Sequence, residues 1–324
     1  MIGLNEILTI WTESSIRLFI YNLSDNLFNF ILFLTILLSA TYYIISTFMV
    51  FYKKRINNKI LENKDMPTVT IQIPTYNELA AIECAKRCLE FDYPKNKYDI
   101  LIGDDSNKPE VSAMLKEFAD HHDKITIVKR EQNIGYKPGN LNNMLKHSKG
   151  DIIIVFDSDF LPEKDFLKKI VVPFKDDEQI CGVQARWTVI QPFRNAVSTL
   201  ATTIVHVVNQ VVMPFVDKTV KVSFLCGSAE AVRKDVLIKL GGWQSGSLTE
   251  DVEYSFRALK NGYKIKYLED LECKCEVPYT PRDMYKQQMR WAYGVIRAYL
   301  DHGIGIAKTG KLTIKEKLST VIVC

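Results

Sequence analysis

The sequence has little net charge and no cysteine framework. Its 42 Lys and Arg against 38 Asp and Glu leave a net charge of +4 over 324 residues, too small and scattered to indicate a nucleic-acid surface. The seven cysteines are an odd number without paired CxxC steps, which argues against a zinc site and a secreted disulfide scaffold. We therefore expect reduced thiols in the cytosol and no nucleic-acid partner.

Glycine-rich nucleotide loops are also missing. No GxGxxG follows an expected strand and no GxxxxGK[ST] occurs, so the sequence supports neither a dinucleotide site nor a P-loop. With 47% hydrophobic and 25% charged residues, the chain is neither disordered nor fibrous. Its length suffices for a full core in one large domain or two ordinary ones.

Formal charge is absent from Asn26 to Tyr52, a run of 27 residues. Because about 20 apolar residues cross about 30 Å of hydrocarbon, residues 26–55 are expected to form a transmembrane helix and its basic flank. A buried core helix is the alternative. The basic residues 53–55 follow the run, and positive flanks stay in the cytoplasm. We expect a cell-membrane protein whose remaining chain is cytosolic.

From Pro67 onward, short apolar runs alternate with segments of helical periodicity. This alternation predicts an α/β fold with a doubly wound, mostly parallel sheet. The expected strands are 69–73, 100–102, 125–128 and 152–156, and the expected helices are 78–89, 109–119, 139–146 and 164–172. Ligands of such a sheet lie beyond the carboxyl ends of its strands.

Polar side chains follow three of these strands. The strands run into Pro74–Glu78, Gly103–Ser106 and Asp157-Ser158-Asp159. In extended backbone, residues two apart point the same way, so Asp157 and Asp159 are expected to present two carboxylates to one spot, with Cα atoms about 7 Å apart. Such hard oxygen ligands suit a divalent cation that keeps positions open for phosphate oxygens. Aspartates that only form turns or cap helices are the alternative.

The second half contains an acidic helix start. Thr249 precedes an apolar stripe at helical spacing that stops at Asn261-Gly262, so we expect Thr249 to be an N-cap. Glu250 and Asp251 then lie in the first turn, where the helix macrodipole favours acids. Helix capping alone could explain both acids.

Gln287, Arg290 and Trp291 stand at i, i+3 and i+4, which places them on one helix face. An indole beside a guanidinium and an amide suits stacking on a sugar and hydrogen bonding to its phosphates or hydroxyls. An Arg–Trp pair that only packs two helices is the alternative.

Together these motifs have the order and approximate spacing of one family. The chain resembles membrane-bound family 2 glycosyltransferases of the cellulose synthase, hyaluronan synthase and chitin synthase type, over roughly residues 67–300. Further matches are IPTYNE at 73–78, KPGNLN at 137–142 and FLCGSA at 224–229. The resemblance implies a glycosyltransferase A fold, a nucleotide-sugar donor, magnesium or manganese, and inversion at the anomeric carbon.

The resemblance also implies a role for each matching residue on the donor side. Lys137 would face the diphosphate, one or both of Asp104 and Asp105 would bond the base, and Asp157 and Asp159 would hold the metal. The full donor-binding set would be Thr75, Tyr76, Glu78, Asp104, Asp105, Lys137 and Asp157.

On the acceptor side, the resemblance makes Asp251 the general base that deprotonates the acceptor hydroxyl, with Glu250 beside it. A cation on the leaving oxygens and a carboxylate on the opposite face are what displacement of a nucleoside diphosphate needs. The residues framing the acceptor and the diphosphate would be Cys226, Gly227, Ser228, Gln287, Arg290 and Trp291.

The resulting expectation is an inverting enzyme with a cytosolic domain over residues 56–300. It would move a sugar, glucose before others, from a UDP-linked donor to a growing β-linked polysaccharide. A single-transfer enzyme acting on a lipid and a non-catalytic nucleotide-sugar-binding membrane module are the alternatives. Expected partners are the donor, the polysaccharide, the lipid bilayer and an accessory or channel subunit.

Three other segments have apolar patterns that could contact the membrane. Residues 1–25 are expected to form an interfacial helix, with a disordered tail as the alternative. The uncharged stretch 195–216 is expected to lie against the membrane or core, because crossing there would separate Asp157 from Asp251. Residues 301–324 would be an interface segment and the start of a further membrane helix. Relatives that extrude polymer have several membrane helices after QxxRW, so export is in doubt here.

Overall fold

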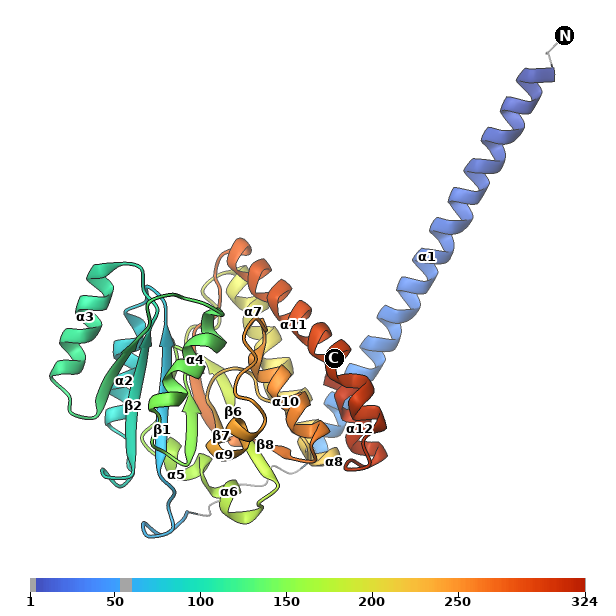
Figure 1. Ribbon diagram of the computed structural model, residues 1–324. Helices are drawn as coiled ribbons and strands as arrows, with labels where there is room; N and C mark the ends of the chain where they lie inside the picture. Colours follow the sequence, from blue (N-terminus) through green and yellow to red (C-terminus); the bar gives the residue numbers. More distant parts are fainter. Residues whose placement is uncertain (1–3, 53–59, 324) are drawn as a thin grey trace. The chain divides into compact units, whose positions relative to one another are not determined.

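The computed structural model describes residues 4–52 and 60–323 (Figure 1). The chain divides into two compact units, Met1–Lys54 and Arg55–Cys324. In the first unit, α1 (Leu4–Phe51) is one α-helix of 48 residues. No Gly or Pro stands within it, so the boundary expected at residue 25 does not interrupt the helix. The basic flank 53–55 lies outside the described residues.

The second unit is built on one sheet of eight strands in the order β3-β2-β1-β4-β7-β6-β8-β5. The strands from β3 to β4 pair in parallel, β7 is antiparallel to both neighbours, β6 and β8 are parallel, and β5 is antiparallel to β8. All four expected strands are present, and the sheet is mostly parallel as predicted. The strands are β1 (Val69–Thr75), β2 (Tyr98–Asp104), β3 (Ile125–Lys129), β4 (Ile152–Val155), β5 (Leu161–Pro162), β6 (Ile180–Val189), β7 (Glu230–Arg233) and β8 (Lys264–Cys275).

Helices cover both faces of the sheet. Successive side chains of a strand point to opposite faces, so one strand packs against helices on both sides. Ile152 and Ile154 belong to the core cluster of α2 and α5, whereas Ile153 and Val155 belong to that of α4, α9 and α10. Together with α3 and α6, these helices have the following bounds: α2 (Ala80–Leu89), α3 (Pro109–Asp120), α4 (Tyr136–His147), α5 (Phe166–Ile170), α6 (Val172–Asp176), α9 (Lys234–Lys239) and α10 (Glu250–Lys260).

One expected helix is divided. The segment 164–172 was predicted as a single helix, but α5 ends at Ile170 and α6 begins at Val172. Pro173 is near the start of α6 and has no N–H to continue the hydrogen bonding of α5, which explains the break. The six cysteines of the described residues form no disulfide with one another.

Two helical stretches of the described residues are long and apolar enough to cross a membrane by length and composition alone. Ser14–Met49 in α1 has a mean hydropathy of 2.0, and Ala196–Val220 has 1.5 with 39% of its apolar window buried. The second stretch consists of α7 (Ala196–His206), the π-helix η1 (Val207–Val212) and α8 (Met213–Val220). These elements pack against β6 and β8, so the helix expected over 195–216 is present and contacts the core.

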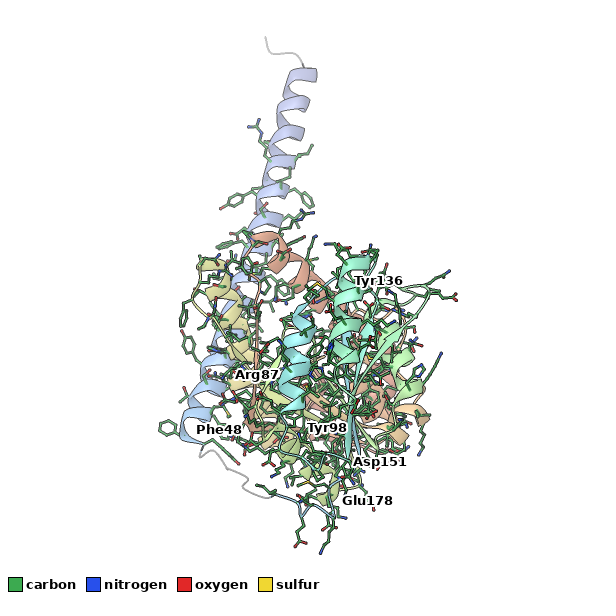
Figure 2. The ribbon with its side chains drawn as sticks, turned by 90° about the vertical axis from the view of Figure 1, so that its left-hand side faces the viewer. Phe48, Arg87, Tyr98, Tyr136, Asp151 and Glu178 are labelled. Atoms are coloured by element: carbon green, nitrogen blue, oxygen red, sulfur yellow. The ribbon has the colours of Figure 1, made fainter. Side chains whose placement is uncertain are left out.

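The strand order reverses beside β1, with β2 and β3 on one side and β4 on the other. The carboxyl ends of β1 and β4 therefore flank the switch point at which α/β sheets bind ligands. Glu230, the first residue of the oppositely directed β7, pairs with Val155 at the end of β4, so the segment before β7 reaches the same edge. Figure 2 shows Tyr136, at the start of α4, and Asp151, just before β4, at opposite ends of the domain.

Candidate active site

Hydrogen bonds tie three loops together at this edge. After β1, Asn77 has a left-handed backbone (φ 56°), and its side-chain oxygen accepts the backbone N–H groups of Asn107 and Lys108, both at 3.1 Å. Glu78 accepts a hydrogen bond from the hydroxyl of Ser158, after β4. The loops after β1, β2 and β4 therefore form one continuous surface at the switch point.

The expected nucleotide contacts after β1 differ in exposure. Thr75 is buried, and its hydroxyl donates to the carbonyl oxygen of Glu78 at 3.0 Å. Tyr76 is 49% exposed, so its ring is available to a ligand. Thr75 therefore shapes the loop, while Tyr76 can touch what binds there.

The two acids after β2 are bonded to protein groups. Asp104 accepts from the hydroxyl of Ser112 at 2.5 Å, and Lys129 Nζ lies 3.4 Å away. Burial raises the pKa of Asp104, but its hydrogen bonds and Lys129 outweigh burial and hold the pKa below its usual value. Asp105 accepts from Arg130 Nε at 2.7 Å and Nη2 at 2.5 Å. A nucleobase that hydrogen-bonds to these two carboxylates must therefore share them with the side chains that already donate to them.

Asp157 and Asp159 follow β4 in a turn. The N–H of Phe160 donates to the carbonyl oxygen of Asp157 at 3.1 Å, so the extended backbone expected here was wrong. Burial and then the negative charge of Asp157 raise the pKa of Asp159 to about 7, so the two carboxyl groups interact electrostatically. Among the described residues, no group of three or more His, Cys, Asp or Glu could hold a metal ion by itself.

Lys137 joins two acidic motifs that are distant in the sequence. Its Nζ lies 2.7 Å from Asp157 Oδ1 and 3.2 Å from Glu250 Oε1, and it donates to the carbonyl oxygen of Gly227 at 2.6 Å. Burial lowers the pKa of Lys137, but the attraction of Asp157 and Glu250 more than offsets burial and raises the pKa above its usual value. The ammonium group therefore stays charged between the two acids.

The segment before β7 places a backbone turn beside Asp251. Gly227 has a left-handed backbone (φ 89°), and a Cβ there would lie 3.1 Å from Asp251 Oδ2. The hydroxyl of Ser228 accepts the N–H of Asp157 at 2.8 Å. Cys226, which precedes the turn, is half-buried. A glycine at 227 therefore lets the aspartate approach while Ser228 fixes the loop after β4.

Glu230 is a buried acid that the sequence analysis missed. It is 1% exposed, and its Oε2 accepts the N–H of Gly227 at 2.8 Å. Burial and then the charge of Asp251 raise its pKa well above the usual value. The signal was its position directly after the FLCGSA segment, where an acid enters a buried strand.

The first turn of α10 carries both expected acids, but the expected cap is absent. Thr249 occupies the N-cap position without a side-chain capping bond, and its Oγ1 is buried with no hydrogen-bond partner in the described part of the chain. Burial and then Glu250 raise the pKa of Asp251 to about 7, although Lys137 opposes this shift. The first turn therefore supplies a carboxylate that exchanges a proton near neutral pH.

Gln287, Arg290 and Trp291 lie on α11 (Pro281–Lys308), as the spacing predicted. Trp291 is half-buried against the core cluster of α2 and α5, and Arg290 is exposed. Gly294, one turn later, is buried against Thr249. Trp291 and Gly294 therefore pack onto the domain, with Gly294 next to the start of α10, whereas Arg290 is open to solvent.

A protein-family model described as "Glycosyltransferase like family 2" matches residues 67–294. The chain belongs to glycosyltransferase family 2. The match includes every residue assigned above to the donor and acceptor sides.

This family 2 glycosyltransferase has relatives among curated proteins. It is 29% identical over 238 residues to the probable glycosyltransferase YdaM of Bacillus subtilis (strain 168), covering 71% of this chain and 56% of that protein. It is 30% identical over 237 residues to glucomannan 4-beta-mannosyltransferase 7 of Arabidopsis thaliana, covering 70% of this chain and 42% of that protein. The chain thus spans about half the length of these relatives.

The fold is similar to that of the mannosyltransferase PcManGT from Pyrobaculum calidifontis, solved with GDP-Man and Mn2+. The TM-score is 0.67 at 22% sequence identity, covering 88% of this chain and 75% of that one. The α/β fold of glycosyltransferase A type that the sequence predicted is thereby confirmed.

Proposed function

We propose that the second unit transfers a sugar from a nucleotide-sugar donor to a hydroxyl of a β-linked glycan, with inversion at the anomeric carbon. The observation that carries this proposal is the position of Lys137, which contacts Asp157 and Glu250 at once. A donor-side and an acceptor-side acid thereby share one site at the switch point of the sheet. The family match supports the same reaction class.

For the donor we propose GDP-mannose ahead of the UDP-glucose that the resemblance favoured. The Arabidopsis relative is named a mannosyltransferase, and the Pyrobaculum enzyme is a mannosyltransferase solved with GDP-Man. The acceptor proposed on the same ground is a β-1,4-linked mannan chain.

The donor would occupy the surface formed by the loops after β1, β2 and β4. The exposed ring of Tyr76 would stack on or border the base, with Thr75 and Glu78 shaping its loop. Asp104 and Asp105 would bond the base as far as their protein donors allow. Lys137 would contact the diphosphate through its charged ammonium group.

Asp157 and Asp159 have the donor chemistry for magnesium or manganese. Burial and the charge of Asp157 raise the pKa of Asp159 to about 7, and magnesium and manganese bind one or two carboxylates together with substrate phosphates. When bound, the cation would stabilise negative charge on the leaving diphosphate.

Asp251 would accept the proton of the acceptor hydroxyl as the sugar is transferred. Its pKa of about 7 lets it bind and release a proton at neutral pH. Glu250 would hold Lys137, and the lack of a side chain at Gly227 would leave room for Asp251, the general base. The acceptor sugar would lie along Cys226–Ser228 on one side and along Gln287, Arg290 and Trp291 on the other.

We also propose a cell-membrane location with a cytosolic second unit. This rests on the apolar stretch Ser14–Met49 and on the basic residues 53–55 that follow α1 in the sequence. The bilayer, the donor and the glycan would then be the partners, with an accessory or channel subunit for any export.

The decisive experiment uses membranes that contain the full chain. They are incubated with radiolabelled GDP-mannose, UDP-glucose or UDP-GlcNAc, each with mannohexaose or cellohexaose, and the products are sized and digested with linkage-specific glycosidases. The expected result is β-linked mannose added to mannohexaose, and none in membranes that carry Asp251→Asn. Incorporation from UDP-glucose alone would overturn the proposed donor, and no incorporation from any donor would overturn the proposed function.

A further inference from the structure

The interface between α10 and α11 carries an inference that rests on the proposed function. We propose that Gly294 and His302 are positioning residues that fix one register of α11 on α10. This register would hold Arg290 and Trp291 at the acceptor side of Asp251. Neither residue needs to touch the reacting atoms.

The first fixed point is the contact of Gly294 with Thr249. A Cβ on Gly294 would lie 2.4 Å from both Oγ1 and Cγ2 of Thr249, closer than non-bonded atoms approach. Because Thr249 makes no capping bond, its side chain acts as a packing surface for α11. Gly294 is one turn after Trp291, and Thr249 is two residues before Asp251, so this contact links the two functional segments at close range.

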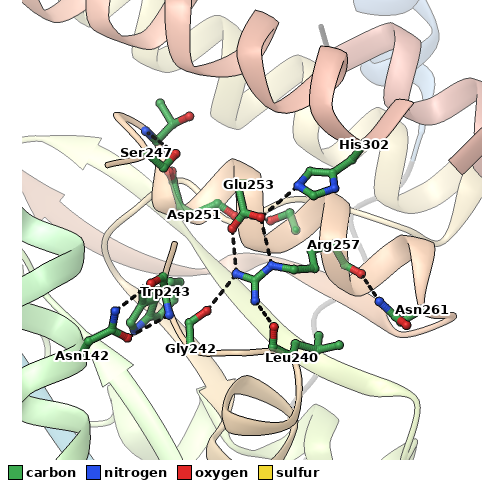
Figure 3. Close-up of polar contacts among 12 residues, drawn as sticks. Asn142, Leu240, Gly242, Trp243, Ser247, Asp251, Glu253, Arg257, Asn261 and His302 are labelled. Atoms are coloured by element: carbon green, nitrogen blue, oxygen red, sulfur yellow. Dashed lines mark hydrogen bonds and ion pairs between the residues drawn. The ribbon is translucent and has the colours of Figure 1, made fainter. Parts of the chain in front are cut away.

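The second fixed point is the contact of His302 with Glu253, shown in Figure 3. His302 Nε2 lies 2.9 Å from Oε1 of Glu253. The same carboxylate accepts from Arg257 Nε at 2.9 Å and Nη2 at 2.7 Å, and Arg257 also donates to the carbonyl oxygen of Gly242 at 2.8 Å. Arg257 thus holds the Glu253 carboxylate in place independently of His302.

Two separated contacts fix the position of α11 on α10 more fully than one contact would. Gly294 and His302 are about 12 Å apart along α11, at 1.5 Å per residue. A helix held at one point can still pivot or rotate, whereas two points fix both its translation and its rotation. The outer face of α11 is open, with Tyr285 67% and Leu300 66% exposed. Helices α7 and α12 (Ile314–Val323) also touch α11, but α10 is its main partner in the described residues.

The test compares the same substitution at two positions of α11. Gly294→Ala introduces the clash with Thr249, whereas the atoms nearest to a Cβ on Gly303 would be those of the Tyr299 ring on its own helix, the first of them at 3.3 Å. Replacing Gly by Ala ordinarily stabilises a helix. We therefore expect Gly303→Ala to raise the melting temperature and Gly294→Ala to lower it.

Kinetics of the full chain in membranes then separate positioning from stability. With GDP-mannose and mannohexaose below the melting temperature, Gly294→Ala is expected to lower kcat/KM for mannohexaose about 100-fold, the loss that a misplacement of about 1 Å can cause. The KM for GDP-mannose should not change. Adding Thr249→Gly removes the clashing atoms and should restore the rate relative to Thr249→Gly alone. His302→Gln, which keeps a donor toward Glu253, should retain more activity than His302→Leu.

The outcomes are distinguishable. An active wild type with a folded Gly294→Ala variant of normal acceptor kinetics would overturn the positioning role but leave the proposed function intact. Equal losses for donor and acceptor, without rescue by Thr249→Gly, would also overturn it. A wild type that transfers no sugar would refute the proposed function and this inference with it.

Discussion

Replacing Asp251 with Asn separates catalysis from helix stability. Asn keeps the shape of the side chain but cannot take a proton, so kcat is expected to fall by about 10² to 10⁴ with donor binding nearly unchanged. For the wild type, log kcat should rise with pH and level off above the pKa of Asp251 at about 7. In the Asp251→Asn variant, this dependence of log kcat on pH below about 7 should be absent.

The same substitution is expected to stabilise the fold at high pH. The pKa of Asp251 is about 7 in the folded chain against a usual 3.8. At 1.36 kcal/mol per unit, this difference costs the folded state up to about 4 kcal/mol when the group is ionised. Because the folded pKa is raised, wild-type stability falls as pH rises from 3.8 to 7. A buried amide without full hydrogen bonding costs about 1–3 kcal/mol, so we expect a net gain of about 1–3 kcal/mol for Asp251→Asn above pH 7.

Denaturant unfolding at pH 4 and pH 8 and transfer kinetics from pH 5 to pH 9 measure the two effects. At pH 4 the stabilisation should have disappeared. Glu250→Gln is the matched control, because it changes the neighbouring acid of the same helical turn and should affect kcat less. Normal turnover by Asp251→Asn would refute Asp251 as the base, and an unchanged stability difference between pH 4 and pH 8 would refute its raised pKa.

Three further predictions concern the metal, the central lysine and the topology. Excess EDTA should abolish transfer, Mg²⁺ or Mn²⁺ should restore it, and Asp159→Asn should remain inactive with either ion; full turnover in EDTA would contradict this. Lys137→Met should abolish transfer and lower the free energy of unfolding by about 1–3 kcal/mol, because it leaves two acids unpaired at a partly exposed site, and a circular-dichroism melt checks this. Cys84 and Cys273 are fully buried and therefore unsuited to report the topology. A cysteine introduced at exposed Glu178 should react with an impermeant maleimide only after cells are permeabilised, and labelling of intact cells would reverse the orientation.

Apolar runs were sufficient to locate the parallel half of the sheet. Strands such as β1 and β4 are buried on both faces and therefore appear as continuous hydrophobic stretches. Strands β6 and β8 are longer and only partly buried, and their pairing shifts register between Ala185 and Arg186. In β8, polar and apolar residues alternate over 264–267 and again over 271–275, but the alternation is interrupted at 268–270. The sequence analysis did not use this signal and placed neither strand.

The motif residues were found, but their partners were not. The sequence identified Lys137, Asp157 and Glu250 separately, whereas the contact among them depends on how α4, β4 and α10 meet in the fold. Thr249 fits an N-cap by residue type, yet packing against Gly294 overrides that local preference. Tertiary contacts of this kind have no signature in residue spacing.

The turn at Gly227 also bears on the order of folding. Each bond that holds it from outside comes from far along the chain: Lys137 is 90 residues away, Gln184 is 42 residues from its partner Cys226, and Asp157 is 71 residues from Ser228. Contacts between distant residues form late, because the chain must first close long loops. We therefore expect the ligand-binding edge to assemble last during refolding, so that helical signal returns before transfer activity does.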